Sequence, residues 1–433
     1  MQPAQLIARK RDGHRLTEQE INAFIEGVCD GSWADYQTAA MLMAMYINGL
    51  NTEETARLTL AMAASGDQLD LSGIAGIKVD KHSTGGVADT TTLILVPLLA
   101  ACDVPVVKMS GRGLGFTGGT IDKLASIPGF RTDLSAEDAI AQARRVGMVI
   151  LAQTARLTPA DRILYALRDV TATIDSIPLI AASIMSKKIA AGSDAIVLDV
   201  KCGSGAFMRT EKEARQLAET MVAIGHQVGR RVRAVISRMD QPLGDYIGNS
   251  LEVLEAIDVL SGRRSGDLLD VTRILGVQLL ELAGRTDSGH MARQLLDQQI
   301  QSGRALDCFR DLILAQGGDS RIVDQPDRLP RAESRAVGLA AQSGYVSRMD
   351  TAALGEAFVD LGGGRRRHED LIDLSAGIIM RKRLGDRVEE GEPLLEVLGP
   401  AGRVKSIRDQ ALNAIQLDSR PPRTRPVVID VIA

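Results

Sequence analysis

The chain has 433 residues, of which 45% are hydrophobic and 3% aromatic, and its formal net charge at pH 7 is −4. This length exceeds what one hydrophobic core usually serves, so we expect two or three domains. The weak negative charge and the scarcity of aromatic side chains argue against a nucleic-acid partner. The cysteines lie far apart in sequence, which favours reduced, buried or partly buried thiols over zinc ligation: Cys29, Cys102, Cys202 and Cys308.

The N-terminal segment has no long apolar core and no small-residue cleavage site, and no apolar run approaches the length of a membrane span. We therefore expect a cytoplasmic protein with no membrane partner.

The first 65 residues have a helical pattern throughout. Thr17 and Glu20 form a capping box before an apolar face, and Asn51 or Thr52 opens another amphipathic helix. Glycines interrupt this pattern within residues 71–80, which we interpret as a linker. The segment before the linker is therefore predicted to be a small all-α unit.

From residue 77 onward, short β-branched runs alternate with helical patterns. Strands are predicted at residues 77–79, 104–107, 148–151, 195–200 and 232–236, with helices between them. Such alternation is typical of a largely parallel sheet that is covered by helices. Thr158 and Pro159 are predicted to cap and begin one helix, and Pro178 to open another. After about residue 331 the segments become shorter.

Two turns rich in glycine and hydroxyl residues follow the first two predicted strands. One opens with Lys81-His82-Ser83-Thr84-Gly85-Gly86, and the other covers residues 110–120. Converging backbone N–H groups, hydroxyls, a lysine and a helix N-terminus together make a cradle for an anion, and phosphate is the natural guest.

A glycine pattern within residues 113–118 also fits the dinucleotide-binding fingerprint by letters, with Asp133 at a suitable distance downstream. However, Pro128 and Gly129 follow too soon for a full crossover helix. We therefore set this interpretation aside.

Longer motifs occur in order along the whole chain. They are KHSTGGV at 81–87, SGRGLG at 110–115, TGGTIDKL at 117–124, LYALRDVTATIDSIPL at 164–179, DVKCGSGAF at 199–207, GNSLEV at 248–253 and GGGR at 362–365. Together they resemble the thymidine and pyrimidine-nucleoside phosphorylase family. The resemblance implies reversible phosphorolysis of uridine, thymidine and deoxyuridine to the free base and ribose or deoxyribose 1-phosphate.

The resemblance also implies the domain organisation. We expect an α/β protein with a small all-α domain, a larger α/β domain with a mainly parallel sheet, and a C-terminal α+β subdomain. The α domain comprises residues 1–70 and the base-binding part 158–193. The α/β phosphate-binding domain comprises 71–157 and 194–330, and the C-terminal subdomain comprises 331–433. A homodimer through the α domain is implied as well.

By resemblance, phosphate is bound by Lys81, Ser83, Thr92 and Thr120. His82 matches the family's active-site histidine, which at an ordinary pKa of about 6.5 can donate a proton to the pyrimidine 2-oxygen. Each residue considered alone is more often a helix cap or a solvated side chain. Their order and spacing together favour a site.

The pyrimidine would be bound by Arg168, Ser183 and Lys187, which match the family's base-binding residues. Two cations and a hydroxyl complement the carbonyl, N–H and carbonyl edge of a uracil ring. Tyr165 would pack beside the base or in the core. Lys108 and Thr92 match the enzymes with broader specificity, which suggests that uridine is accepted, although Lys108 could also be a surface lysine.

The resemblance implies no organic cofactor. It does imply a monovalent cation, which we expect to be K⁺. Some family members hold one through oxygen ligands that match Ala88, Thr90, Leu243, Tyr246 and Glu255.

Two departures from the family pattern bear on activity. Phe116 stands where a histidine is usual, and Ala88 replaces a usual glycine. Because His82 is a different residue, we do not infer an inactive enzyme. A phosphorylase with altered base or sugar specificity, and a non-catalytic nucleoside- or phosphate-binding homologue, remain as alternatives.

Overall fold

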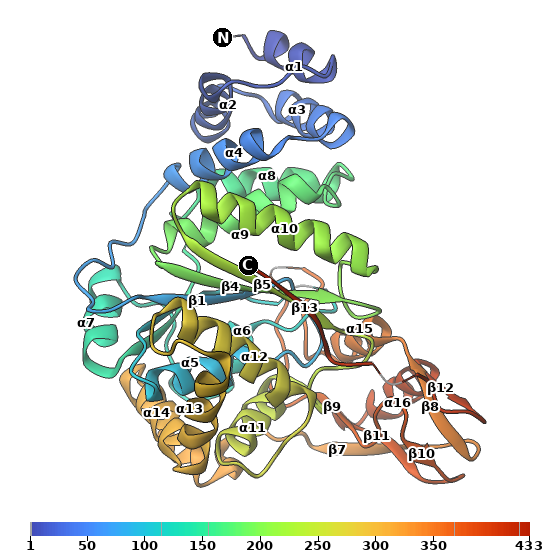
Figure 1. The fold of residues 1–433 in the computed structure, drawn as a ribbon. Helices are drawn as coiled ribbons and strands as arrows, with labels where there is room; N and C mark the ends of the chain where they lie inside the picture. The colour runs from blue at the N-terminus through green and yellow to red at the C-terminus, as the bar shows by residue number, and fades with distance from the viewer. Residues whose placement is uncertain (1, 114, 155, 368, 424) are drawn as a thin grey trace.

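The computed structural model describes residues 2–113, 115–154, 156–367, 369–423 and 425–433. Figure 1 shows a layer of helices at the N-terminal end, a sheet with helices on both faces, and a smaller C-terminal part. This confirms the predicted fold class, with a small all-α domain, a larger α/β domain and a C-terminal α+β subdomain. Leu114, within the second predicted turn, lies outside the described residues.

The helical layer is built from two stretches of the chain. Helices α1 (Pro3–Arg11), α2 (Glu18–Asp30), α3 (Asp35–Asn48) and α4 (Thr52–Ala64) pack with α8 (Pro159–Val170) and α9 (Ile177–Ala190). They share one apolar core, to which Phe24 and Leu58 contribute from the first stretch and Leu164 and Leu179 from the second. The predicted capping box of Thr17 and Glu20 is present, and Asn51 rather than Thr52 caps α4.

The central sheet has six strands in the order β13-β5-β4-β1-β2-β3. Five strands run parallel, and β13 is antiparallel to β5. Their bounds are β1 (Val79–Ser83), β2 (Val106–Ser110), β3 (Met148–Ala152), β4 (Ala195–Cys202), β5 (Arg231–Arg238) and β13 (Val428–Ile432).

Helices cover both faces of this sheet (Figure 1). Helices α9 and α10 (Glu211–Gln227) lie on one face. The opposite side is formed by α5 (Thr91–Ala101), α11 (Asn249–Leu260), α12 (Asp267–Leu282), α13 (Gly289–Gln301) and α14 (Arg304–Ala315). In β4, Ile196 and Leu198 pack on the first face and Val197 on the second, as strand geometry requires. The short α6 (Thr120–Ala125) and α7 (Ala136–Val146) complete this domain.

The C-terminal part contains two small antiparallel sheets. Its elements are β7 (Ser334–Leu339), β8 (Gly344–Met349), α15 (Thr351–Leu361), β9 (Gly377–Met380), β10 (Arg387–Val388), β11 (Pro393–Gly399), α16 (Val404–Asn413) and β12 (Ile415–Asp418). Two short 3₁₀ helices, η1 (Ser320–Val323) and η2 (Pro326–Arg328), precede it.

Two strands cross the boundaries that the sequence suggested. β6 (Tyr246–Ile247) pairs with β9, although its segment was assigned to the α/β domain. β13 pairs with β5 of the central sheet, although residues 331–433 were assigned to the C-terminal subdomain. Both pairings satisfy backbone groups at the edge of a sheet, which a sequence pattern does not specify.

The first two strands begin and end later than predicted. Lys81, His82 and Ser83 belong to β1, where they pair with Val197, Leu198 and Asp199 of β4, and the turn begins only after them. The prediction that these residues lie in a turn was therefore wrong. Pairing with a central neighbour extends β1 through polar residues that have no β-branched signal.

Two smaller predictions also fail. Thr158 precedes α8 in a left-handed conformation (φ 46°), and its hydroxyl makes no capping hydrogen bond. Cys29 is exposed, whereas Cys102 and Cys202 are buried and Cys308 is partly buried, as expected.

In the part of the chain that the structure describes, we find no helix with the length and apolar character needed to cross a bilayer.

Candidate active site

The topology of the central sheet indicates where a ligand would bind. From β1 the chain proceeds to β2 and β3 on one side, and then to β4 and β5 on the other. The strand order thus changes direction between β1 and β4. In open α/β sheets such a switch point leaves a crevice at the carboxyl ends of the strands, where ligands bind. Ser83 ends β1 and Cys202 ends β4, so the crevice begins at these residues.

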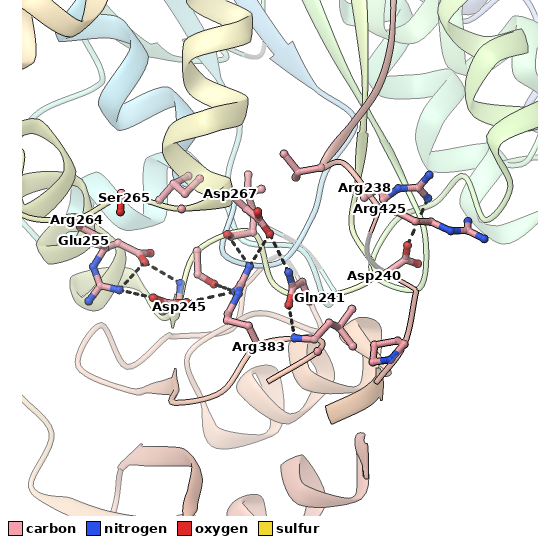
Figure 2. A pocket seen from close by; sticks show the side chains of 18 of the residues that line it. Arg238, Asp240, Gln241, Asp245, Glu255, Arg264, Ser265, Asp267, Arg383 and Arg425 are labelled. Carbon is pink, nitrogen blue, oxygen red and sulfur yellow. Dashed lines mark hydrogen bonds and ion pairs between the residues drawn. The ribbon is translucent and has the colours of Figure 1, made fainter. Parts of the chain in front are cut away.

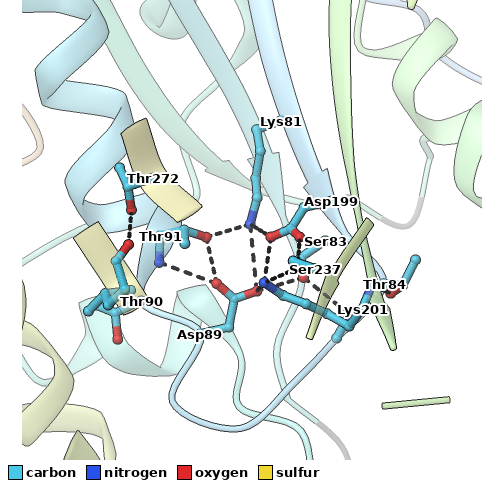
Figure 3. A network of polar contacts seen from close by, with 12 residues as sticks. Lys81, Ser83, Thr84, Asp89, Thr90, Thr91, Asp199, Lys201, Ser237 and Thr272 are labelled. Carbon is cyan, nitrogen blue, oxygen red and sulfur yellow. Dashed lines mark hydrogen bonds and ion pairs between the residues drawn. The ribbon is translucent and has the colours of Figure 1, made fainter. Parts of the chain in front are cut away.

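Lys81 lies in a buried network of charges at this crevice (Figure 3). Its Nζ donates to Thr91 Oγ1 at 2.6 Å and lies 3.4 Å from Asp199 and 3.6 Å from Asp89. Lys201, on β4, lies 2.7 Å from the carboxylate of Asp199. Sequence reasoning missed Asp89, Asp199 and Lys201, although the last two stand in the DVKCGSGAF motif.

Of the other proposed phosphate ligands, Ser83 lies at the crevice, and Thr92 and Thr120 lie at the starts of two helices of the same domain. Ser83 Oγ donates to Asp89 Oδ2 at 2.6 Å. Thr92 is in the first turn of α5 and lines a small internal cavity together with Lys81 and Lys108. Thr120 is the first residue of α6, at the end of the second glycine turn.

The second glycine turn is held by residues that sequence reasoning also missed. Asp122 Oδ2 accepts the backbone N–H of Gly113 at 2.7 Å, and Asp122 Oδ1 pairs with Arg365 of the C-terminal subdomain at 2.7 Å. Lys123 lies 2.6 Å from Glu252 and donates to the carbonyl of Asp89 at 2.7 Å. Buried ion pairs thus connect this turn to two other parts of the chain.

His82 lies on β1 among positive charges. Burial and the nearby ammonium groups hold its pKa well below the ordinary value of 6.5; the lysines are Lys188, Lys108, Lys187 and Lys81. The imidazole is therefore neutral near pH 7. It can donate one N–H, but it does not carry the positive charge that the ordinary pKa would allow at mildly acidic pH.

The three proposed base-binding residues come from α8 and α9. Arg168 is buried, and its guanidinium donates to the carbonyls of Thr173, Ile174 and Leu179. Among the described residues these contacts use three of its five N–H groups, so two can serve a ligand. The guanidinium carbon lies 6.0 Å from the centre of the Tyr165 ring.

Lys187 and Ser183 share one face of α9, as their spacing predicts. Lys187 Nζ donates to Ser183 Oγ at 3.0 Å and to Asp161 Oδ2 at 2.6 Å. Asp161 Oδ1 is buried without a hydrogen-bond partner among the described residues. Asp161 was not predicted, and it supplies the counter-charge that orients Lys187. Tyr165 is 43% exposed, so the core-packing alternative is wrong.

Lys108 is buried on β2, so the alternative of a surface lysine is also wrong. Its Nζ donates to the carbonyl of Met109 at 2.7 Å and lies 3.5 Å from Asp80. Burial lowers the pKa of Lys108 to about 7, because nearby Asp80 offsets only part of the desolvation. Asp80 also pairs with Lys188 of α9 at 2.7 Å, which joins the helical layer to β1.

The residues proposed for a cation gather around Gly244. Its N–H donates to the carbonyl of Ala88 at 3.1 Å, and a Cβ on Gly244 would meet Glu255 Oε2 at 2.2 Å. Leu243 precedes it, and Tyr246 begins β6 nearby. Glu255 and Leu243 also line a cavity of about 430 Å³ next to the C-terminal subdomain (Figure 2).

These oxygen atoms are suited to a hard cation. Glu255 Oε2 is buried and accepts no hydrogen bond from the described residues, and burial raises the pKa of Glu255 to about 8. A cation would keep this carboxylate ionised. The Thr90 hydroxyl donates to Glu252 at 2.8 Å, which leaves its oxygen lone pairs available. The Leu243 carbonyl already accepts from Arg383 at 3.2 Å.

Phe116 and Ala88 are the two residues that depart from the family pattern, and each has a distinct local environment. The Phe116 ring lies 5.6 Å from that of Phe207, centre to centre, in a tilted pair. Phe207 Cε2 lies 3.4 Å from the place of a Cβ on Gly85, so this pair lies beside the first glycine turn. Ala88 has a left-handed backbone (φ 54°), which a glycine would adopt without strain.

Comparisons with known proteins agree with this architecture. Residues 4–66 match the helical bundle domain of a glycosyl transferase family, and residues 75–306 match the a/b domain of that family. Residues 345–418 match the pyrimidine nucleoside phosphorylase C-terminal domain. An anthranilate phosphoribosyltransferase from Thermus thermophilus has a similar fold, with a TM-score of 0.60 and 19% identity over 72% of this chain and 99% of that one.

Curated relatives are much more similar in sequence. The chain is 49% identical over 433 residues to a pyrimidine-nucleoside phosphorylase of Geobacillus stearothermophilus, covering 100% of both chains. It is 53% identical over 397 residues to one of Staphylococcus aureus, covering 92% of each. With such identity along the full length, the chain belongs to the pyrimidine-nucleoside phosphorylase family.

Proposed function

We propose that the chain catalyses the reversible phosphorolysis of pyrimidine nucleosides. Uridine, thymidine or deoxyuridine would react with inorganic phosphate to give the free base and ribose or deoxyribose 1-phosphate. One observation supports this site most directly. Strand β1, which carries Lys81 and Ser83, is joined to α9, which carries Ser183 and Lys187, by the 2.7 Å ion pair of Asp80 and Lys188.

In this reaction a phosphate oxygen attacks the anomeric carbon while the bond from that carbon to the base nitrogen breaks. The bonding electrons leave with the base, and the sugar carries partial positive charge at the transition state. Lys81 would supply charge to hold the phosphate, and hydroxyl groups would direct its oxygens: those of Ser83, Thr92 and Thr120. Holding both reactants in one crevice lowers the entropic barrier to their reaction.

The base would be held by Arg168, Ser183 and Lys187 through its carbonyl and N–H edge. Cationic donors placed there stabilise the negative charge that develops on the leaving pyrimidine. His82 would donate its N–H to the 2-oxygen as a neutral imidazole. The positive charge at this end of the site then comes from lysines, because the surroundings of His82 oppose its protonation.

The direct test is the release of uracil and thymine from uridine, thymidine and deoxyuridine, with and without phosphate. We expect release only with phosphate, and a large loss of kcat in Lys187→Ala and His82→Ala. Base release that does not need phosphate would contradict the proposal. Nucleoside binding without turnover, unchanged in His82→Ala, would instead support a non-catalytic homologue, which the comparisons do not favour.

A narrower proposal concerns substrate specificity, namely that the enzyme accepts uridine. It is supported by Lys108 and Thr92, which line the same small cavity beside the first residues of β1. We expect Lys108→Met to lower kcat/KM for uridine more than for thymidine. An equal loss for both nucleosides would remove Lys108 from the determinants of specificity.

We also propose that K⁺ binds between the carbonyls of Ala88, Leu243 and Tyr246 and the side chains of Thr90 and Glu255. The buried Oε2 of Glu255, which accepts no hydrogen bond within the described part of the chain, supports this site. When bound, the cation would supply positive charge only. By attracting the oxygen atoms of Ala88 and Thr90, it would hold the loop after β1 in place. Replacing KCl by choline chloride should lower the melting temperature of the wild type but not of Glu255→Gln, whereas equal behaviour of the two proteins would argue against the site.

A homodimer through the helical layer is proposed as well. The outer face of α3 exposes large apolar side chains, namely Tyr36 at 76%, Met43 at 37% and Ile47 at 71%. Exposed apolar side chains that gather on one helix face are typical of an interface. Sedimentation should give a dimer for the wild type and monomers for Ile47→Asp.

A cytoplasmic location stays part of the proposal, supported by four free cysteines.

A further inference from the structure

The carboxylate of Asp89 lies at the centre of the network in the proposed phosphate crevice (Figure 3). It accepts from Ser83 Oγ at 2.6 Å and from Thr91 Oγ1 at 2.5 Å. It also lies 3.6 Å from Lys81 Nζ and 3.8 Å from Lys201 Nζ. Its oxygens therefore accept hydrogen bonds from two hydroxyl groups and lie within ion-pair distance of two ammonium groups, and a phosphate oxygen would be stabilised by the same kinds of group.

The position of Asp89 makes it a strong competitor for these donors. Its side chain is 8% exposed, so little water screens its attraction to the ammonium groups of Lys81 and Lys201. Two of its contacts, Ser83 and Lys81, are also proposed phosphate ligands.

Asp89 and phosphate compete for the proton of Ser83. A serine hydroxyl has one proton, so it cannot donate to Asp89 and to a bound phosphate oxygen at the same time. Phosphate must also share the charge of Lys81 with a carboxylate that is already in place. A hydrogen bond donated by Ser83 to phosphate thus requires the bond between Ser83 and Asp89 to break.

We propose that Asp89 is an internal counter-anion that occupies the donors of the empty phosphate site and sets its affinity for phosphate. It is a positioning residue. Its contacts keep Lys81 and Ser83 directed into the crevice, and these contacts break when phosphate binds. This inference rests on the proposed phosphorolysis. Neighbouring Ala88 has a strained left-handed backbone (φ 54°), so the segment that carries Asp89 is held in place at an energetic cost.

The test is steady-state kinetics of the full chain with phosphate varied at saturating thymidine. In Asp89→Asn we expect KM for phosphate to fall about tenfold, the size of one charge-assisted hydrogen bond. KM for thymidine should not change. A general loss of folding or packing would not lower one KM and spare the other.

Asp199→Asn is the matched control. Asp199 belongs to the same network and lies near Lys81 and Lys201, but its hydrogen bond is with Ser237 instead of Ser83. If only charge mattered, both variants would lower KM for phosphate alike, and the proposal would be wrong. An unchanged or raised KM in Asp89→Asn would also overturn it, because Asp89 would then help to bind phosphate.

A measurement on the wild type keeps the proposal testable if the variants fold poorly. In crystals soaked with phosphate, Asp89 Oδ2 should have left hydrogen-bond distance of Ser83 Oγ. A phosphate in contact with Ser83 while the bond between Ser83 and Asp89 persists would contradict the inference. The proposed function fails separately, if the wild type shows no phosphate-dependent release of base.

Discussion

Ala88 illustrates how one residue can depart from a pattern at a local cost. Its φ of 54° is disfavoured by a Cβ, yet its segment carries Asp89 and Thr90, both of which contact buried partners. The contacts of these two residues hold the backbone in place. Glycine would relieve this strain, but it would also remove the methyl group of Ala88, which is buried in the apolar core of the C-terminal subdomain.

Ala88→Gly should therefore change the free energy of unfolding by less than about 0.5 kcal/mol, because relief of strain offsets the lost methyl burial and the extra entropy of glycine in the unfolded chain. Ala166→Gly, in the exposed middle of α8, should lower it by about 1 kcal/mol. Urea unfolding of both variants checks this. A loss of stability in Ala88→Gly as large as that in Ala166→Gly would show that the left-handed backbone is not strained.

Lys108 gives a dependence of stability on pH whose sign follows from its burial. Its pKa falls from 10.5 to about 7 on folding, so between these values the unfolded chain binds a proton that the folded chain does not. Stability contributed by this residue should therefore rise with pH from about 7 to about 10. Lys108→Met should flatten that rise.

Unfolding by urea at several pH values in this window measures the slope. Lys405→Met, which replaces an exposed lysine on α16, should keep the slope of the wild type. Identical slopes in the wild type and Lys108→Met would mean that Lys108 keeps its ordinary pKa in the folded protein.

At the scale of elements, the second glycine turn depends on a partner far along the chain. A Cβ on Gly119 would meet the backbone nitrogen of Gly113 at 1.9 Å, so the two ends of the turn can approach only as glycine. Asp122 and Arg365 then close the turn from α6 and from the C-terminal subdomain. Thr120, a proposed phosphate ligand, lies between these contacts.

Arg365→Gln should raise KM for phosphate and leave KM for nucleoside nearly unchanged, because it releases Asp122 and the turn. It should also destabilise the fold by about 3 kcal/mol, as expected when one partner of a buried ion pair is removed. Arg366→Gln is the control, since Arg366 pairs with Asp360 at the surface. Kinetics with phosphate and nucleoside varied separately distinguish the effects, and equal rises in both KM values would contradict this role.

At the scale of the whole molecule, the proposed ligands divide between two layers. The proposed phosphate ligands belong to the α/β domain and the proposed base ligands to the helical layer, so closure of these two parts would exclude water from the reacting sugar. The linkers at residues 65–80, 153–158 and 191–194 are the candidate hinges. Stiffening one of them should slow closure more than it weakens binding.

Gln68→Pro is suited to this test because Gln68 is exposed in the first linker. We expect kcat to fall several-fold while KM for nucleoside changes little. Glu333→Pro, in an exposed segment before β7, should leave both constants unchanged. A parallel loss of kcat and affinity in Gln68→Pro would count against closure as the slow step.

The sequence alone was sufficient to predict the fold class, most helices, the family and the residues proposed for the site, because these depend on local periodicity, capping and motifs. It did not predict the partners of those residues. Asp89 contacts Lys201, Asp122 contacts Arg365 and Asp161 contacts Lys187, and each pair joins separate elements.

Only the tertiary structure decided these pairings, together with the burial of Lys108 and the return of β13 to the central sheet. The physical reason is that charge and polarity alone do not determine a partner. The register of parallel strands and the packing of helices on them decide which carboxylate meets which ammonium group. Local propensity determines the elements, whereas their packing determines the electrostatics of the site.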